Sequence, residues 1–154
     1  IDFQSLLFSA WWKVPSEGIN IDEYIDVDFN GIPTIKIIVN PVNVLANQNP
    51  IESWLDTGAK ISYLNKQYVQ GLDSVCIKED FFPGFGEFEV PIYDLPISFN
   101  GKEIPFQFGI LPQSLELANL SGTTQAIIGA DIFSYFSLTF NYADKKIYIH
   151  QLDD

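Results

Sequence analysis

Residues 53–59 read Ser-Trp-Leu-Asp-Thr-Gly-Ala, and this stretch is the most informative part of the chain. A short apolar run ends in a carboxylate, Asp56, and the Thr and Gly that follow are residues typical of tight turns. Such a turn can direct one acidic oxygen toward a substrate. The tripeptide Asp56-Thr57-Gly58 occurs only once, so any reaction that needs two such carboxylates would need two chains.

The composition predicts one folded domain with an acidic surface. A chain of 154 residues, 47% of them hydrophobic, can bury a core, and no apolar run approaches the ~18–20 residues of a membrane span. The net charge is -12, from 20 acidic residues against 8 basic ones, all of them Lys. This balance disfavours binding to nucleic acid or to anionic membranes. We expect a single domain over residues 1–154, with its core at about 20–150 and an extension or interface strand at 1–19.

The beginning of the chain leaves its origin open. It starts at Ile1 and the sequence contains no Met, which predicts a processed or trimmed form. The apolar start has neither a basic leader nor a small-residue cleavage site. A signal or membrane anchor upstream of Ile1 therefore stays open, and so does the compartment: periplasmic, membrane-tethered or cytoplasmic.

Several kinds of catalytic site are disfavoured by residue counts. Cys76 is the only Cys and His150 the only His, so no internal disulfide and no usual zinc site is expected. A Cys-His pair is disfavoured because His150 lies in a strand-like run near the end of the chain. A Ser-His-Asp triad would lack the Gly-x-Ser-x-Gly elbow. Carboxylates and backbone groups remain, and we expect no cofactor and no metal.

Short apolar runs separated by turn residues predict an all-β domain, a barrel or sandwich, with one or two short helices. Asn30-Gly31 and Asn100-Gly101 predict hairpin turns. The expected strands and helical turns follow as residue ranges: strands at 21–29 and 35–39 around the first turn, at 51–55 and 61–64, at 95–99 and 105–111 around the second turn, and at 126–128, with a final hairpin of 136–140 and 146–149; helical turns at 66–71, capped by Asn65, and at 114–120.

The segment 81–90 predicts a further hairpin, because Gly84 and Gly86 flank Phe85 among other aromatic residues. Glycine at such a tip permits backbone conformations that other residues avoid. We expect this tip to be mobile.

Two motifs together resemble a known family. Leu55-Asp56-Thr57-Gly58-Ala59 resembles the active-site turn of aspartic peptidases, and the run 127–133, Ile-Ile-Gly-Ala-Asp-Ile-Phe, resembles their second motif. The glycine hairpin between them is suited to be a flap. Order, spacing and size resemble the single-lobe, retropepsin-like branch, over roughly residues 20–150. The resemblance implies an acid protease barrel and an aspartic endopeptidase acting on a peptide or protein substrate.

The chemistry of that family explains the residue types. Peptide hydrolysis without a metal, Ser or Cys needs a base to activate water and an acid to protonate the amide. Two carboxyls held close together cannot both ionise, so they share one proton and can fill both roles. Since this chain has one such turn, the resemblance implies a C2 homodimer in which each subunit supplies Asp56.

The resemblance also assigns roles to individual residues. Asp56 is the catalytic residue, Thr57 braces the two turns across the dimer, and Gly58 and Ala59 line the substrate cleft. The other implied residues are the flap, with Phe82, Gly84, Phe85 and Gly86, and the supporting second motif, with Ile128, Gly129 and Asp131.

The sequence departs from the retroviral pattern at two positions. Retroviral members usually carry an ion pair formed by an Asp after the Ala of the first motif and an Arg after the Gly of the second. Here those positions are Lys60 and Ala130. Cellular and bacterial relatives often lack the pair, so the departure favours that branch. The dimer would then be held in another way, by the run 147–150 or by the apolar N-terminus.

Two other interpretations stay open. The chain could be a catalytically inactive, protease-like module for binding or dimerisation. It could also be an unrelated acidic β-barrel in which the Asp56 turn is only structural.

Overall fold

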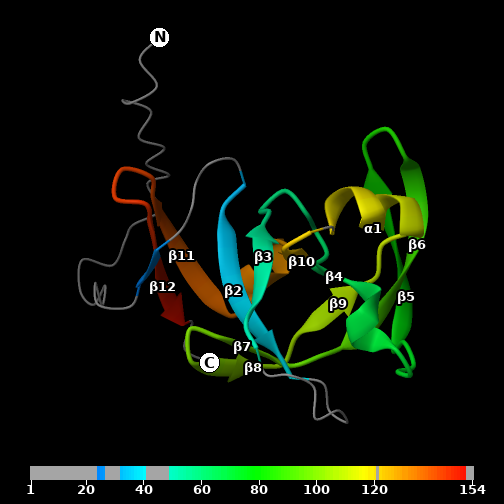
Figure 1. Ribbon diagram of the computed structural model, residues 1–154, viewed down its shortest axis with the longest axis horizontal. Coiled ribbons are helices and arrows are strands. Elements are labelled where there is room, and N and C mark those ends of the chain that lie inside the picture. Colours follow the sequence, from blue (N-terminus) through cyan, green and yellow to red (C-terminus); the bar gives the residue numbers. More distant parts are fainter. Residues whose placement is uncertain (1–23, 27–31, 41–48, 121, 152–154) are drawn as a thin grey trace.

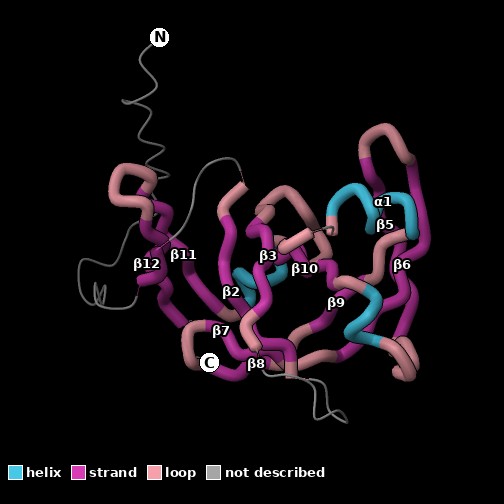
Figure 2. The backbone as a smooth tube through the Cα atoms, viewed as in Figure 1, coloured by secondary structure: helices cyan, strands magenta, loops and turns pink. Residues whose placement is uncertain are grey.

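The computed structural model describes residues 24–26, 32–40, 49–120 and 122–151, and within them the chain is mostly β (Figures 1 and 2). This confirms the all-β prediction with few short helices. The strands are β1 (Tyr24–Asp26), β2 (Thr34–Val39), β3 (Ile51–Leu55), β4 (Tyr63–Leu64), β5 (Cys76–Phe82), β6 (Gly86–Asp94), β7 (Ile97–Phe99), β8 (Lys102–Ile104), β9 (Gln107–Gly109), β10 (Thr124–Ile128), β11 (Phe136–Asn141) and β12 (Lys146–Gln151). The helices are α1 (Gln113–Asn119) and the 3-10 turns η2 (Lys66–Val69) and η3 (Ala130–Ser134). None of the described helices could span a membrane.

The strands form two sheets. Nine of them pair in the order β5-β6-β9-β4-β10-β3-β2-β7-β8, and the other three in the order β1-β12-β11. In Figure 1 the three-stranded sheet lies on the left and the β5–β6 hairpin on the right. Neither sheet closes on itself among the described strands, so the expected closed barrel is not what these strands form.

The centre of the large sheet positions the site. β10 pairs in parallel with β3, matching Ile128 with Leu55, and antiparallel with β4, matching Ile127 with Tyr63. β3 and β4 follow one another in the chain but lie on either side of β10. The connection 56–62 therefore has to pass around the carboxyl end of β10, where the ends of β3 and β10 meet.

Hydrophobic packing holds β10 on both faces. Ile128 is fully buried in the larger apolar cluster, whereas Ile127 belongs to a second cluster. Successive side chains of a strand point to opposite faces, so both clusters fix this strand. Phe99 and Phe136 meet edge to face within the larger cluster, with ring centroids 5.3 Å apart.

The first expected hairpin is wrong. β1 pairs with β12, while β2 pairs with β3 and β7, so the two runs belong to different sheets. The turn Asn30-Gly31 itself lies outside the described residues, as does the expected extension at 1–19. Turn chemistry shows where the chain can reverse, but long-range pairing decides which strands meet.

The second hairpin is confirmed at its turn and wrong in its return strand. Asn100 and Gly101 both have positive φ, 50° and 75°, as the turn chemistry requires. The returning strand is β8 at 102–104 rather than 105–111, because Pro105 has no N–H with which to continue the ladder. The expected range contains β9 instead, which pairs with β6 and β4.

Other predicted elements are confirmed. The strand at 51–55 forms, Asn65 caps η2 by accepting from the Gln67 N–H at 3.1 Å, and the hairpins β5–β6 and β11–β12 form. The run 147–150 lies within β12, whose Ile147 and Tyr148 pair with β1 and β11 at once. That part of β12 therefore has no free edge for a partner subunit, contrary to one suggestion from the sequence.

Candidate active site

The turn after β3 is held by backbone hydrogen bonds. The Asp56 N–H donates to the Ile128 carbonyl at 2.9 Å, which continues the parallel pairing of β3 with β10 by one residue. The Ala59 N–H donates to the Asp56 carbonyl at 3.1 Å and closes the turn on itself. The position of Asp56 is thus set by β10 rather than by the turn alone.

The Asp56 side chain faces the turn that it begins. One carboxylate oxygen, Oδ1, accepts from the Gly58 N–H at 2.9 Å. Asp56 is half-buried, and Thr57 and Gly58 are exposed. A Cβ added to Gly58 would lie 3.2 Å from that oxygen, so glycine keeps the approach open. One carboxylate is thereby presented at the surface on a fixed backbone.

The second motif packs directly against the backbone that follows Asp56. The Ala130 N–H donates to the Ala59 carbonyl at 2.8 Å. A Cβ on Gly129 would lie only 2.6 Å from the same carbonyl oxygen and 3.1 Å from that of Ile61. Only glycine fits at this contact. The structure therefore brings Ile128 and Gly129 against the Asp56 turn.

A buried hydroxyl links the two motifs, and the sequence analysis missed it. Ser62, which is fully buried, accepts from the Gly129 N–H at 2.8 Å and donates to Asp131 Oδ1 at 2.5 Å. The Ser62 N–H donates to Asp131 Oδ2 at 3.1 Å. The only pattern that could have indicated Ser62 is a polar residue within the apolar run 61–64.

The environment of Asp131 changes its acidity. Desolvation by burial raises the pKa of this carboxyl above 3.8, and the hydrogen bonds from Ser62 oppose that rise. The side chain joins η3 to the segment after the Asp56 turn. We interpret Asp131 as a structural link between the motifs.

The expected flap is a long hairpin at the edge of the large sheet. β5 pairs only with β6 among the described strands, and the Phe85 N–H closes the tip on the Phe82 carbonyl at 3.0 Å. Gly84 and Gly86 have φ of 83° and 99°, which suits glycine. Phe81 and Phe85 are 61% and 46% exposed. In Figure 1 the tip and the turn after β3 lie toward the same side of the molecule.

One side-chain contact ties this hairpin to the centre of the sheet. The Tyr63 hydroxyl donates to an Asp80 carboxylate oxygen, joining β4 to β5. Burial, together with the hydrogen bond and the charge of Asp80, raises the pKa of Tyr63 well above its usual value. The hydroxyl therefore stays protonated and remains a donor.

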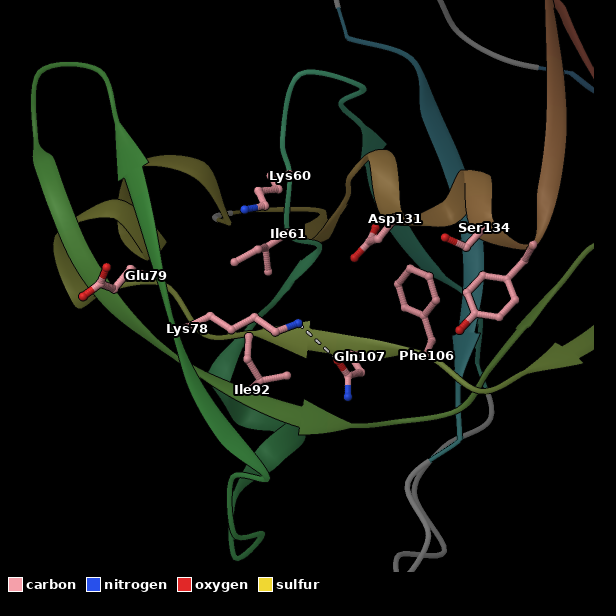
Figure 3. A pocket seen from close by; sticks show the side chains of 10 residues that line it. Lys60, Ile61, Lys78, Glu79, Ile92, Phe106, Gln107, Asp131 and Ser134 are labelled. Atoms are coloured by element: carbon pink, nitrogen blue, oxygen red, sulfur yellow. Dashed lines mark hydrogen bonds between the residues drawn. The ribbon is translucent and has the colours of Figure 1, made fainter.

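A cavity of about 530 Å³ is lined in part by the connection that follows the Asp56 turn (Figure 3). Lys60 and Ile61 line it from the connection after the turn, Lys78 lines it from β5, and Asp56 is not among the lining residues. Within the described residues, no group of His, Cys, Asp and Glu side chains is arranged to hold a metal ion.

The chain matches no protein-family model and no curated protein. Among solved structures, it is similar to the simian foamy virus (mac) protease in solution, with a TM-score of 0.44 and 10% identity over 64% of this chain and 88% of that one. It is also similar to the EIAV protease complexed with the inhibitor HBY-793, with a TM-score of 0.47 and 20% identity over 71% of this chain and 92% of that one. At these identities and TM-scores, the roles of the residues have to be inferred from the geometry of this chain.

Replacing Gly129 by Ala should destabilise the protein by about 3 kcal/mol, because the new methyl group meets backbone rather than a movable side chain. Gly71→Ala is the control: Gly71 has a φ of 79° with nothing within 4 Å of an added Cβ, so only backbone strain of about 1–2 kcal/mol is expected. Urea unfolding of both variants measures the difference. Equal losses of unfolding free energy in the two variants would contradict the close contact at Gly129.

Replacing Asp131 by Asn should change how stability depends on pH. Because the folded state raises the pKa of Asp131 above 3.8, its contribution to stability is fully present below pH 3.8 and is lost as pH rises through the folded-state value. The free energy of unfolding of the wild type, relative to Asp131→Asn, should therefore fall between pH 3 and pH 7. Urea unfolding across that range measures it, with Asp73→Asn, at an exposed position, as the control. A relative stability that rises with pH would refute the prediction.

Replacing Tyr63 by Phe should loosen the β5–β6 hairpin, since it removes the donor to Asp80. We expect a loss of about 1–3 kcal/mol, the usual cost of leaving a partly buried polar group unpaired. Amide hydrogen exchange should accelerate in β5 and β6 more than in the β11–β12 hairpin, which serves as the internal control. Uniform acceleration in both hairpins would argue against a local tie.

Proposed function

We propose that the chain is an aspartic endopeptidase of the retropepsin-like type, active as a homodimer in which two Asp56 carboxylates flank one water. The observation that carries this proposal is the presentation of Asp56. Its carboxylate stands at the surface on a turn fixed by Ile128, Ala59 and Gly58. A group positioned this rigidly suits chemistry that depends on geometry.

The proposed reaction needs a second carboxylate, and the chain supports a second copy as its source. In the described part of the chain, the Asp56 carboxylate bonds only to the Gly58 N–H. The turn is exposed at Thr57 and Gly58, so another subunit can approach it. Thr57 would then brace the two turns across a C2 axis, where each subunit offers the same surface.

The catalytic step follows from two carboxyls that share one proton. The ionised Asp56 takes a proton from water, and the resulting oxygen nucleophile attacks the carbonyl carbon of the peptide bond. The protonated Asp56 of the other subunit donates its proton to the leaving nitrogen as the C–N bond breaks. Gly58 and Ala59 would hold the substrate backbone, and the aromatic tip with Phe82 and Phe85 would close over it and exclude water.

The proposal places the chain with the cellular or bacterial members of the family. Ala130 donates its backbone N–H to Ala59, and Lys60 lines the neighbouring cavity. Lys60 and Ala130 cannot form the ion pair that retroviral members carry at these positions. The connection between the two motifs is instead made by Ser62 and Asp131.

Replacing Asp56 by Asn should reduce cleavage by about 10²–10⁴-fold, the usual contribution of general acid–base catalysis. The fold should persist, because the amide oxygen of Asn can still accept from the Gly58 N–H. Cleavage of a peptide library with apolar residues at the centre is measured by mass spectrometry, and folding by circular dichroism. Asp73→Asn, an exposed carboxylate elsewhere, is the matched control. Undiminished cleavage by Asp56→Asn would refute the peptidase proposal.

Mixing the wild type with the Asp56→Asn variant tests the dimer separately. If each active site needs two Asp56 residues, activity at fixed total protein should fall as the square of the wild-type fraction. A linear fall would mean that one chain is sufficient.

The alternative is a protease-like module for binding or dimerisation. The exposed aromatic side chains of β5 favour it, since an edge strand can pair with a partner without any catalysis. Dimeric mass in solution without cleavage of the library at acidic or neutral pH would favour this module over the peptidase.

A further inference from the structure

The cavity beside the Asp56 turn is lined by two Lys side chains, although the protein as a whole is acidic. Lys60 comes from the connection after the turn and Lys78 from β5 of the hairpin, so a Lys lines each side. The chain has 8 basic residues against 20 acidic ones, and two of the Lys residues share this cavity. The lining also holds Glu79 and Asp131, so its formal charge is balanced, whereas the whole chain has a net charge of -12.

Both Lys ammonium groups are available to a ligand. Lys78 Nζ donates to Gln107 Oε1 at 3.3 Å, a long contact with a neutral group (Figure 3). Lys60 and Lys78 are exposed, and neither forms a salt bridge within the described residues. Lys66, in contrast, is paired with Glu116 at 3.4 Å. A bound carboxylate would give Lys60 and Lys78 an anionic partner that the described residues do not supply.

The acidic residues of the lining make their hydrogen bonds elsewhere or point away from the two ammonium groups. Both carboxylate oxygens of Asp131 already accept from Ser62. Glu79 follows Lys78 on the same strand, so its side chain points to the opposite face, and Figure 3 shows it directed away from Lys60 and Lys78. Asp80 faces the same side as Lys78 but accepts from Tyr63.

The rest of the lining suits the stem of an extended side chain. Ile61, Ile92 and Phe106 supply apolar surface between the polar groups. The volume of about 530 Å³ is large enough for one peptide side chain together with water. A carboxylate on a short aliphatic stem fits this combination of apolar walls and cationic rim.

We propose that this cavity is a specificity subsite that accepts an acidic side chain, Glu or Asp, of the peptide substrate through Lys60 and Lys78. The inference rests on the proposed peptidase function, because a peptide lying across the Asp56 turn beneath the hairpin passes the cavity. An extended peptide advances about 3.3 Å per residue with side chains on alternating faces. We expect the acidic residue to stand a few positions from the cleaved bond, since Lys60 follows Asp56 by four residues.

The test is a panel of octapeptides with Phe and Leu around the central bond, in which each flanking position in turn carries Glu, Gln or Lys. Binding to the Asp56→Asn protein is measured by fluorescence anisotropy, and cleavage is measured with the wild-type residue at 56. At one position Glu should bind about tenfold tighter than Gln, as one charge-assisted contact provides, and Lys should bind more weakly than Gln.

Substitutions then assign the preference to the cavity. In the Lys60→Gln, Lys78→Gln double variant, the ratio of Glu to Gln affinity should fall to near one. Lys36→Gln, which removes an exposed Lys on β2 outside the cavity, should leave that ratio unchanged. Charge reversal by Lys78→Glu should favour the Lys peptide.

The outcomes separate the two proposals. Equal binding of Glu and Gln at every position, failure of every peptide to bind, or a Glu preference that survives the double variant overturns the subsite. A Glu preference that the double variant abolishes supports it. If the wild type then cleaves none of the panel, the peptidase proposal fails while the acidic side-chain site stands.

Discussion

The structure of the site depends on the contact of Gly129 with the backbone after Asp56. β3 and β10 run in parallel, and their carboxyl ends meet where the Asp56 N–H reaches the Ile128 carbonyl. The chain can turn around β10 only if position 129 is Gly. A Cβ at that position would lie only 2.6 Å from the Ala59 carbonyl oxygen. Backbone hydrogen bonds on both sides of Gly129 convert this close approach into a fixed position for Asp56.

Polar groups buried behind the turn are matched within the chain. Ser62 accepts from Gly129 and donates to Asp131, so one hydroxyl joins the segment after the Asp56 turn to the second motif. Leaving any of these groups without its partner would cost more than the hydrogen bond itself contributes, because they are shielded from water. The network therefore specifies one arrangement of the two motifs and keeps the Asp56 turn in place.

The β5–β6 hairpin contributes both an exposed aromatic tip and one wall of the cavity. β5 is an edge strand with exposed aromatic side chains, and its tip relies on glycine conformations. Close to that tip, Asp80 of β5 accepts from Tyr63 of β4, which ties the hairpin to the centre of the sheet. The proposed closure over a peptide would therefore involve only the tip beyond Asp80. Lys78 lies on the other side of this tie from the tip, so its place beside the cavity does not depend on movement of the tip.

Much of the local structure could be predicted from sequence, because local patterns have local causes. Alternating apolar residues produced the strand at 51–55 and the final hairpin, and Asn100-Gly101 could form its turn without help from the rest of the chain. Asn65 capped its helix for the same reason. Asn30-Gly31 led to a wrong pairing, because β1 and β2 bury their side chains against different neighbours.

The sequence by itself determined the candidate carboxylate, its turn residues, the glycine of the second motif and the acidic character of the chain. These are properties of residue type and order. Tertiary structure alone decided that β10 lies between β3 and β4, that Ser62 joins Gly129 to Asp131, and that Lys60 and Lys78 share a cavity. Each of these relations connects residues distant in the chain. They depend on which strands pair and which faces are buried, and no local sequence pattern encodes that choice.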